Sequence, residues 1–199
     1  MHDNRKLRPW ELALLLAVCF TLLTGVWAQE RQVALAGKLV RLHVVAASDS
    51  AEDQAEKLRV RNAVLAVLTP RLEAAADSED ALEIIRAAVP ALRKAAKSAT
   101  AQTVRVEFGT EHYPTRRYDT FSLPAGNYTS LRITLGAGAG HNWWCVVFPP
   151  LCVESALTPE AVETLSADDV RLITEETGEY QIRFRILELW DKIAEKLEK

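Results

Sequence analysis

The clearest pattern in the chain is an alternation of apolar and polar residues followed by a helical repeat, in the stretch Leu39–Leu72. In an extended segment, one face would hold Leu42, Val44 and Ala46, and the other Arg41, His43 and Val45. Because the second face also includes an apolar residue, we expect a helix to cover it. The pattern therefore predicts a strand that is covered on both faces.

A turn and a capped helix follow this strand. Ser48, Asp49 and Ser50 carry side chains that bond to nearby backbone N–H groups. Ser50 is followed three residues later by Asp53, which resembles a capping box with Asp in place of Glu or Gln, so we predict that both residues cap the helix. The predicted apolar face comprises Leu58, Val64, Leu65, Leu68 and Leu72. Pro70 predicts a kink or an end near Leu68–Thr69.

A second amphipathic repeat predicts another helix that begins at Asp77 or Ser78. Its apolar positions are Leu82, Ile85, Val89 and Leu92. Pro90 interrupts this repeat, so we predict a break there and a third helix that runs to about Ser98.

Alternation returns in the second half of the chain. We predict strands at Thr103–Phe108, Thr120–Leu123, Tyr128–Leu135 and Trp143–Phe148, with a loop from Tyr113 to Tyr118. The glycine-rich segment 136–140 (GAGAG) connects the last two strands. A phosphate-binding loop would need a helix after it, whereas a strand follows here, so we predict a hairpin.

These elements predict an α/β or α+β fold with a mixed sheet of four to five strands. Two or three helices lie between the first two strands, and an amphipathic helix from about Ile186 to Glu198 closes the chain. The long helical crossover predicts that strands 1 and 2 are parallel, and the glycine links predict antiparallel later strands. Ser166 to Asp169 predicts a further capping box. We expect an α/β core domain at 29–153 and a C-terminal extension at 154–199.

Residues 1–28 have the pattern of a signal peptide. Arg5, Lys6 and Arg8 precede an apolar run, and Val26-Trp27-Ala28 offers a cleavage site before Gln29. An uncleaved membrane anchor is the alternative, because the apolar stretch is nearly long enough to span a bilayer. These residues hold three of the 24 basic and two of the 27 acidic residues, so the exported chain keeps 21 and 25. This balance, without a basic stripe, argues against a nucleic-acid partner.

If the chain is exported, its cysteines can form a disulfide. Cys145 and Cys152 remain as an even pair in a compartment that permits disulfides, and Pro149-Pro150 between them can turn the chain back. The alternative is that Cys145 lies in a central strand and Cys152 beyond it, since an extended path would separate them by over ~20 Å. Both thiols would then be buried apolar groups.

The sequence offers little catalytic chemistry. His43, Ser48 and Asp49 have the atoms of a hydrolytic triad, but they occupy one strand and its turn, where turn and cap roles explain them more simply. The histidines have no metal-site spacing, so we predict no catalytic residue, metal or cofactor. His141 would be a loop contact and, with Trp143 and Trp144, a candidate interface residue. Trp143 and Trp144 point to opposite faces, so one is an interface anchor or both are buried.

Two stretches resemble the hallmark sequences of the stage II sporulation protein R family of endospore-forming bacteria. The first is RLHVVAASDSAEDQAEKLRVRNAVL at 41–65, and the second is HNWWCVVFPPLC at 141–152. The segment LPAGNYTSLRITLGAGAG at 123–140 fits the same family. Together these matches cover most of Leu39–Val153.

The resemblance implies a function that the residues alone do not reveal. It implies a signalling protein without catalysis of its own, secreted from the forespore into the septal intermembrane space. Its partner would be a membrane-embedded aspartic protease on the mother-cell side, which then removes the pro-sequence of a sporulation sigma factor. The alternatives are an extracytoplasmic hydrolase that uses His43 or His141, and a cell-wall or ligand-binding module that uses Trp143 or Trp144.

Overall fold

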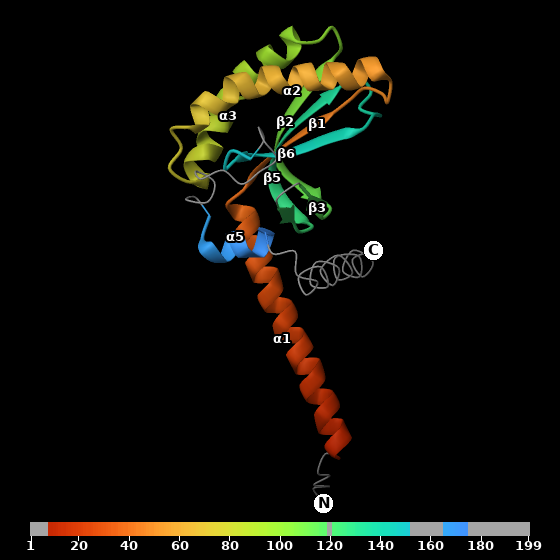
Figure 1. Cartoon of the computed structure of the whole chain (residues 1–199), viewed down its shortest axis with the longest axis vertical. Coiled ribbons are helices and arrows are strands. Elements are labelled where there is room, and N and C mark those ends of the chain that lie inside the picture. Colours follow the sequence, from red (N-terminus) through yellow and green to blue (C-terminus); the bar gives the residue numbers. More distant parts are fainter. Residues whose placement is uncertain (1–7, 119–120, 152–164, 175–199) are drawn as a thin grey trace, which may run out of the picture.

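The computed structural model describes residues 8–118, 121–151 and 165–174, and its elements follow one another as shown in Figure 1. They are α1 (Pro9–Gly37), β1 (Val40–Val45), α2 (Ala51–Leu72), α3 (Ser78–Ser98), β2 (Val104–Tyr113), β3 (Arg116–Arg117), β4 (Ser122–Leu123), β5 (Gly126–Leu135), β6 (Asn142–Phe148) and α5 (Ala167–Thr174). The C-terminal helix predicted from Ile186 to Glu198 lies outside the described residues.

The main sheet has four strands in the order β2-β5-β1-β6. β1 runs parallel to β5 and antiparallel to β6, and β2 runs antiparallel to β5. The fold is therefore α+β with a mixed sheet, as predicted. A second, two-stranded sheet pairs β3 with β4, so the segment predicted as a loop from Tyr113 to Tyr118 contains a short strand.

The prediction that the first two strands are parallel is wrong. β5 is parallel to β1 and antiparallel to β2, so β1 and β2 run in opposite directions and are not neighbours. The reason is the number of helices between them. Two antiparallel helices return the chain to the end at which β1 finished, whereas one or three would return it to the start. Pro90 does not divide α3, so there are two helices.

Neither proline ends its helix where the sequence suggested. Pro70 lies in the last turn of α2, which continues to Leu72, and Pro90 lies inside α3. Pro90 has no N–H group to donate to the Arg86 carbonyl, four residues earlier. Both residues are exposed, so water can bond to that carbonyl instead. The cost of the missing hydrogen bond is therefore smaller than it would be on a buried face.

The hairpin predicted at the glycine-rich segment is also wrong, because β1 lies between β5 and β6. The loop crosses the end of β1 and bonds to it: the N–H groups of Ala139 and Gly140 donate to the carbonyls of Ala47 and Ala46 at 3.1 and 3.0 Å. A Cβ atom on Gly140 would lie 2.1 Å from the Ser48 carbonyl oxygen. Glycine is thus required for the close crossing.

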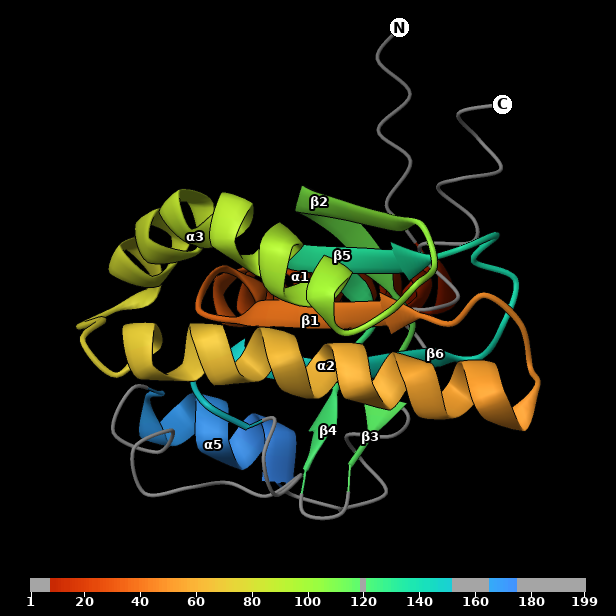
Figure 2. The same cartoon turned by 90° about the horizontal axis from the view of Figure 1, so that it is seen from above.

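α2 and α3 lie side by side over one face of the sheet, which Figure 2 shows from above. Their buried residues pack on Leu42 and Val44 of β1, and they are Val60, Val64, Leu68, Leu72, Ala81, Ile85, Ala88, Leu92 and Ala96. The predicted face of α2 was rotated slightly from the true one. Leu58 is 37% exposed, whereas Val60 and even Lys57 are buried.

The opposite face is covered by the end of α1, the β3–β4 sheet and α5 (Figure 1). All six residues of β1 are buried, so the strand is covered on both sides as predicted. α5 begins with the predicted capping box. The Ser166 N–H donates to the Asp169 carboxylate at 3.1 Å, and the Asp169 N–H donates to Ser166 Oγ at 3.3 Å.

α1 is long and apolar enough to cross a membrane, with a mean hydropathy of 2.0 over its most apolar 18 residues. A signal sequence has the same properties. The predicted cleavage point before Gln29 lies within this helix, and the last turn of the helix is part of the folded domain. Leu35 and Ala36 are buried there, and Lys38 forms an ion pair of 2.5 Å with Asp169.

Candidate functional site

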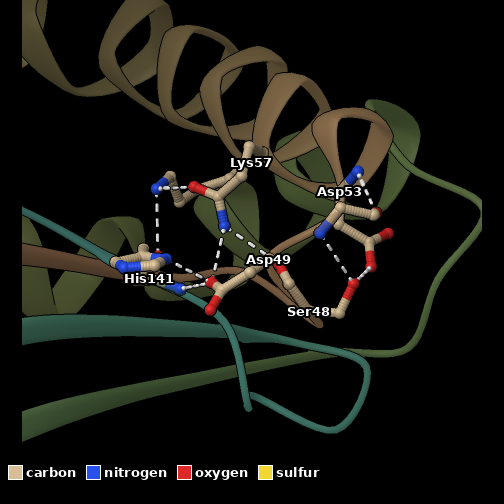
Figure 3. A network of polar contacts seen from close by, with 7 residues as sticks. Ser48, Asp49, Asp53, Lys57 and His141 are labelled. Carbon is tan, nitrogen blue, oxygen red and sulfur yellow. Dashed lines mark hydrogen bonds and ion pairs between the residues drawn. The ribbon is translucent and has the colours of Figure 1, made fainter.

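Two loops meet at one edge of the sheet, because the parallel strands β1 and β5 both end there. Asp49 from the first loop binds His141 from the second (Figure 3). The His141 backbone N–H donates to the Asp49 carboxylate at 2.6 Å, and the Nδ1 atom of the ring contacts the same oxygen. The His141 side chain is otherwise 77% exposed.

Lys57 of α2 connects the helix to the His141 loop through hydrogen bonds. Its side chain is only 5% exposed, and Nζ donates to Gln54 Oε1 at 2.6 Å and to the His141 carbonyl oxygen at 3.0 Å. Burial lowers the pKa of Lys57, while the negative charge of Asp49 acts in the opposite direction. Gln54 in turn donates to the Ser48 carbonyl at 2.9 Å. The His141 loop is thus held against the N-terminal turns of α2.

The helix cap lies beside this network. Ser50 is the N-cap of α2, and its Oγ accepts from the Asp53 N–H at 3.2 Å. The Asp53 carboxylate does not return to the Ser50 backbone but accepts from Ser48 Oγ at 2.5 Å and from the Gln102 amide at 2.6 Å. The hydrogen bond from Ser48 is the main cause that lowers the pKa of Asp53. Ser48 therefore takes part in the cap together with Ser50 and Asp53.

The atoms of the hypothetical triad point to separate partners. His43 bonds to Glu111 at 2.8 Å and to Asn142 at 3.0 Å, whereas Ser48 donates to Asp53 and Asp49 binds His141. Among the residues that the structure describes, no group of three or more His, Cys, Asp or Glu side chains is arranged to hold a metal ion.

The adjacent tryptophans lie on opposite faces of β6, as the alternation predicts. Trp143 packs on the helix-covered side, where the Arg61 guanidinium lies 4.3 Å from its ring centroid. Trp144 lies on the other side, with Arg116 at 3.5 Å and the His43 ring at 5.3 Å. Both tryptophans are half-buried. Each ring is therefore covered in part by an arginine.

Cys145 is buried in β6 and faces the helix-covered core. Cys152 lies outside the described residues, so the disulfide stays a prediction.

The face of the sheet opposite α2 and α3 carries a partly buried polar network, and we call this face the polar face. Glu111 is its centre: it accepts from Ser130 at 2.8 Å and from Arg132 at 3.1 Å, and it bonds to His43. Tyr113 completes the network through a hydrogen bond of 2.7 Å to Ser130. Burial alone would raise the pKa of Glu111, but the hydrogen bonds of Ser130 and His43 hold it below its usual value.

Arg41, the second residue of β1, is the residue of this face whose importance sequence reasoning missed. It is completely buried between the rings of Tyr113 and Tyr128, whose centroids lie 3.8 and 4.9 Å from its guanidinium carbon. Nη2 donates to the Tyr118 hydroxyl at 2.8 Å. Burial raises the pKa of Tyr113 strongly and that of Tyr128 to about 12, so both are neutral phenols at physiological pH. The available signal was a charged residue flanked by apolar ones in a strand predicted to be covered on both faces.

These features define the class of protein: an α+β domain with helices on one face of a mixed sheet and a polar face on the other, preceded by an apolar helix. No solved structure matches the chain. The sequence model of the family described as Stage II sporulation protein R matches residues 36–158. Stage II sporulation protein R of Bacillus subtilis (strain 168) is 36% identical over 141 residues, which are 68% of this chain and 63% of that protein. The chain belongs to the stage II sporulation protein R family.

Proposed function

We propose that this chain is an exported sporulation signal that activates a membrane-embedded aspartic protease, and that the protease then removes the pro-sequence of a sigma factor in the mother cell. In this proposal the chain leaves the forespore and acts in the septal intermembrane space. The observation that carries the proposal is family membership over residues 36–158, which include both hallmark stretches.

The N-terminal helix supports export. Its apolar residues from Leu12 to Val26 are exposed in the folded chain, so they have no role in the core of the domain. Such a helix suits a signal sequence or an anchor. In either case the domain that begins at Leu35 would reach the extracytoplasmic side.

The contacts at the sheet edge support a role in recognition rather than catalysis. Within the described residues, the His141 ring bonds to Asp49 alone, and Lys57 bonds to the carbonyl of the same residue. A histidine that serves as a general base must also reach the proton of a nucleophile. The Asp49–His141 pair instead positions an exposed loop next to Trp143 and Trp144.

The proposal is tested in the organism that makes the chain. Deletion of the gene should leave the sigma-factor precursor uncleaved in the mother cell, and the wild-type gene should restore cleavage. A variant without residues 1–28 keeps the whole family match but loses the export signal, so it should accumulate in the forespore cytoplasm without restoring cleavage. Restoration by this cytoplasmic variant would contradict the proposal.

The hydrolase alternative is distinguished by His141→Ala and His43→Ala. If the chain hydrolyses wall or peptide, one of these variants loses that activity while its thermal unfolding stays close to that of wild type. If the chain is a signal, the purified protein releases no product from either substrate, with or without these substitutions.

A further inference from the structure

Three arginines on the polar face have buried N–H groups without an acceptor, and one of them, Arg132, has its charge balanced by the ion pair with Glu111. The other two are Arg41 and Arg116. Arg41 is 0% exposed, and neither Nε nor Nη1 has a hydrogen-bond partner. Since Nε carries one hydrogen and Nη1 two, three of its five donors are unsatisfied. Arg116 of β3 adds a buried Nε that also has no partner. Buried donors of this kind are uncommon in folded proteins, and charged ones are the most costly.

No carboxylate among the described residues pairs with either arginine. Glu111, on the same face, is already bound by His43, Ser130 and Arg132. Burial is the main cause that lowers the pKa of Arg116, and the charge of Arg41 acts in the same direction. The contacts agree with this, because Arg41 lies on the Tyr113 ring and Arg116 on the Trp144 ring, and the His43 ring lies 6.1 and 5.3 Å from these two rings. A buried positive charge beside a partly buried one, neither of them paired, favours a negative group close to both.

Aromatic rings hold both guanidinium groups in place. Arg41 is stacked on Tyr113 and Tyr128, and Arg116 lies 3.5 Å from the ring centroid of Trp144. A guanidinium that lies on a ring keeps the N–H groups at its edge available for a planar, bidentate acceptor. The Tyr118 oxygen accepts from Arg41, so its own O–H is left to donate elsewhere. The unsatisfied donors are therefore preorganised.

We propose that Arg41 and Arg116 together bind one oxyanion, a carboxylate or a phosphate group, on the polar face of the sheet, with the Tyr118 hydroxyl as a further donor. The oxyanion accepts N–H groups from both arginines and balances their charge. Carboxylate and phosphate share the geometry that a guanidinium recognises. The site does not depend on the signalling role, so it stands or falls separately.

The test uses the full chain in a neutral detergent, with the Nε–H signals of its arginines followed by nuclear magnetic resonance. Sodium phosphate and sodium acetate are titrated in separate samples, with chloride adjusted to keep the ionic strength constant. We expect saturable shifts of the Arg41 and Arg116 signals, and no saturable shift of the signal from exposed Arg117. A response to phosphate alone or to acetate alone identifies which oxyanion the site takes. Absence of a saturable response in both samples overturns the proposal.

The neighbours Arg116 and Arg117 provide a matched pair of variants. Arg116→Lys keeps the positive charge but removes the Nε–H group, so it should weaken anion binding about tenfold or more. Arg117→Lys makes the same chemical change at an exposed position and should bind as wild type does. Circular dichroism verifies that both variants are folded. Equal affinities of the two variants would show that the response is a general effect of charge and would overturn the proposal.

Discussion

Leu42 and Arg41 are neighbours in β1, yet their side chains belong to layers of opposite character. Leu42 lies among aliphatic residues of α2 and α3, and its burial is favourable by about 2 kcal/mol. Arg41 is equally buried, but between tyrosine rings and beside a network of charged groups. One strand thus supports two kinds of interior.

The two layers differ in what they contribute to stability. The helix-covered layer contributes apolar burial, whereas the polar face contains a buried charge whose cost other contacts must offset. The helix-covered face would stabilise almost any domain of this architecture. The buried guanidinium of Arg41 makes the polar face less stable, because its transfer from water costs several kcal/mol unless it is paired. The polar face also has an apolar core of its own, so its buried charge is an added feature and the better place to look for recognition.

The largest effect should come from the helix-covered face. Leu42→Ala should lower the free energy of unfolding by about 3 kcal/mol, because it leaves a cavity in a packed layer. Leu58→Ala is the control: the sequence placed this leucine in the apolar face of its helix, but it is 37% exposed, and its truncation should cost less than about 1 kcal/mol. Urea unfolding of both variants measures the difference. Similar losses would contradict the packing described.

The cysteines offer a second test of the same face. If Cys145 and Cys152 form a disulfide, Cys145→Ser should cost about 2–3 kcal/mol without removing an active group. Peptide mapping of the non-reduced protein after alkylation gives the direct answer. Two alkylated peptides, one for each of these cysteines, would mean that there is no bridge.

On the polar face, removal of a buried side chain should stabilise the protein. Arg41→Met, measured in a buffer without phosphate or carboxylate, should raise the free energy of unfolding by about 1 kcal/mol, because an apolar chain of similar length replaces an unbalanced buried charge. A loss comparable to that of Leu42→Ala would show that the guanidinium holds the tyrosine rings together and would remove the contrast between the faces.

The smallest effect should be a change in how the free energy of unfolding depends on pH. The pKa of Glu111 lies below its ordinary value of 4.5 in the folded chain, where Ser130, His43 and Arg132 contact it. Its contribution to stability is therefore full above about pH 4.5 and is lost as the pH falls through the folded pKa. Urea unfolding between pH 6 and pH 3 should show a smaller loss for Glu111→Gln than for wild type. Equal losses would mean that other acids account for the change.

Local patterns predicted the elements well, because their causes lie within a few residues. The alternation at Leu42 and Val44, the cap at Ser50 and the capping box at Ser166 all act over short spans. The direction of β2 was mispredicted because a long helical crossover was taken to mean parallel strands, although the sequence left open whether it held two or three helices. A single extra helix reverses every strand that follows.

The polar face was beyond sequence reasoning for a different reason. Its contacts join residues far apart in the chain: Arg41 meets Tyr118 across 77 positions, and His43 meets Glu111 across 68. Strand order decides these contacts, and no periodicity specifies which strand lies beside which. The Asp49–His141 contact has the same origin, since it requires the crossing of the glycine-rich loop over the end of β1.

The most direct measurement of the proposed function is reconstitution. The candidate membrane-embedded aspartic protease is placed in liposomes with its sigma-factor precursor on the cytoplasmic side, and the purified chain is added on the opposite side. Cleavage of the precursor should appear only when the chain is present, and Leu58→Ala should activate as well as wild type. Cleavage to the same extent without the chain, or cleavage by the chain in liposomes that lack the protease, would contradict the account.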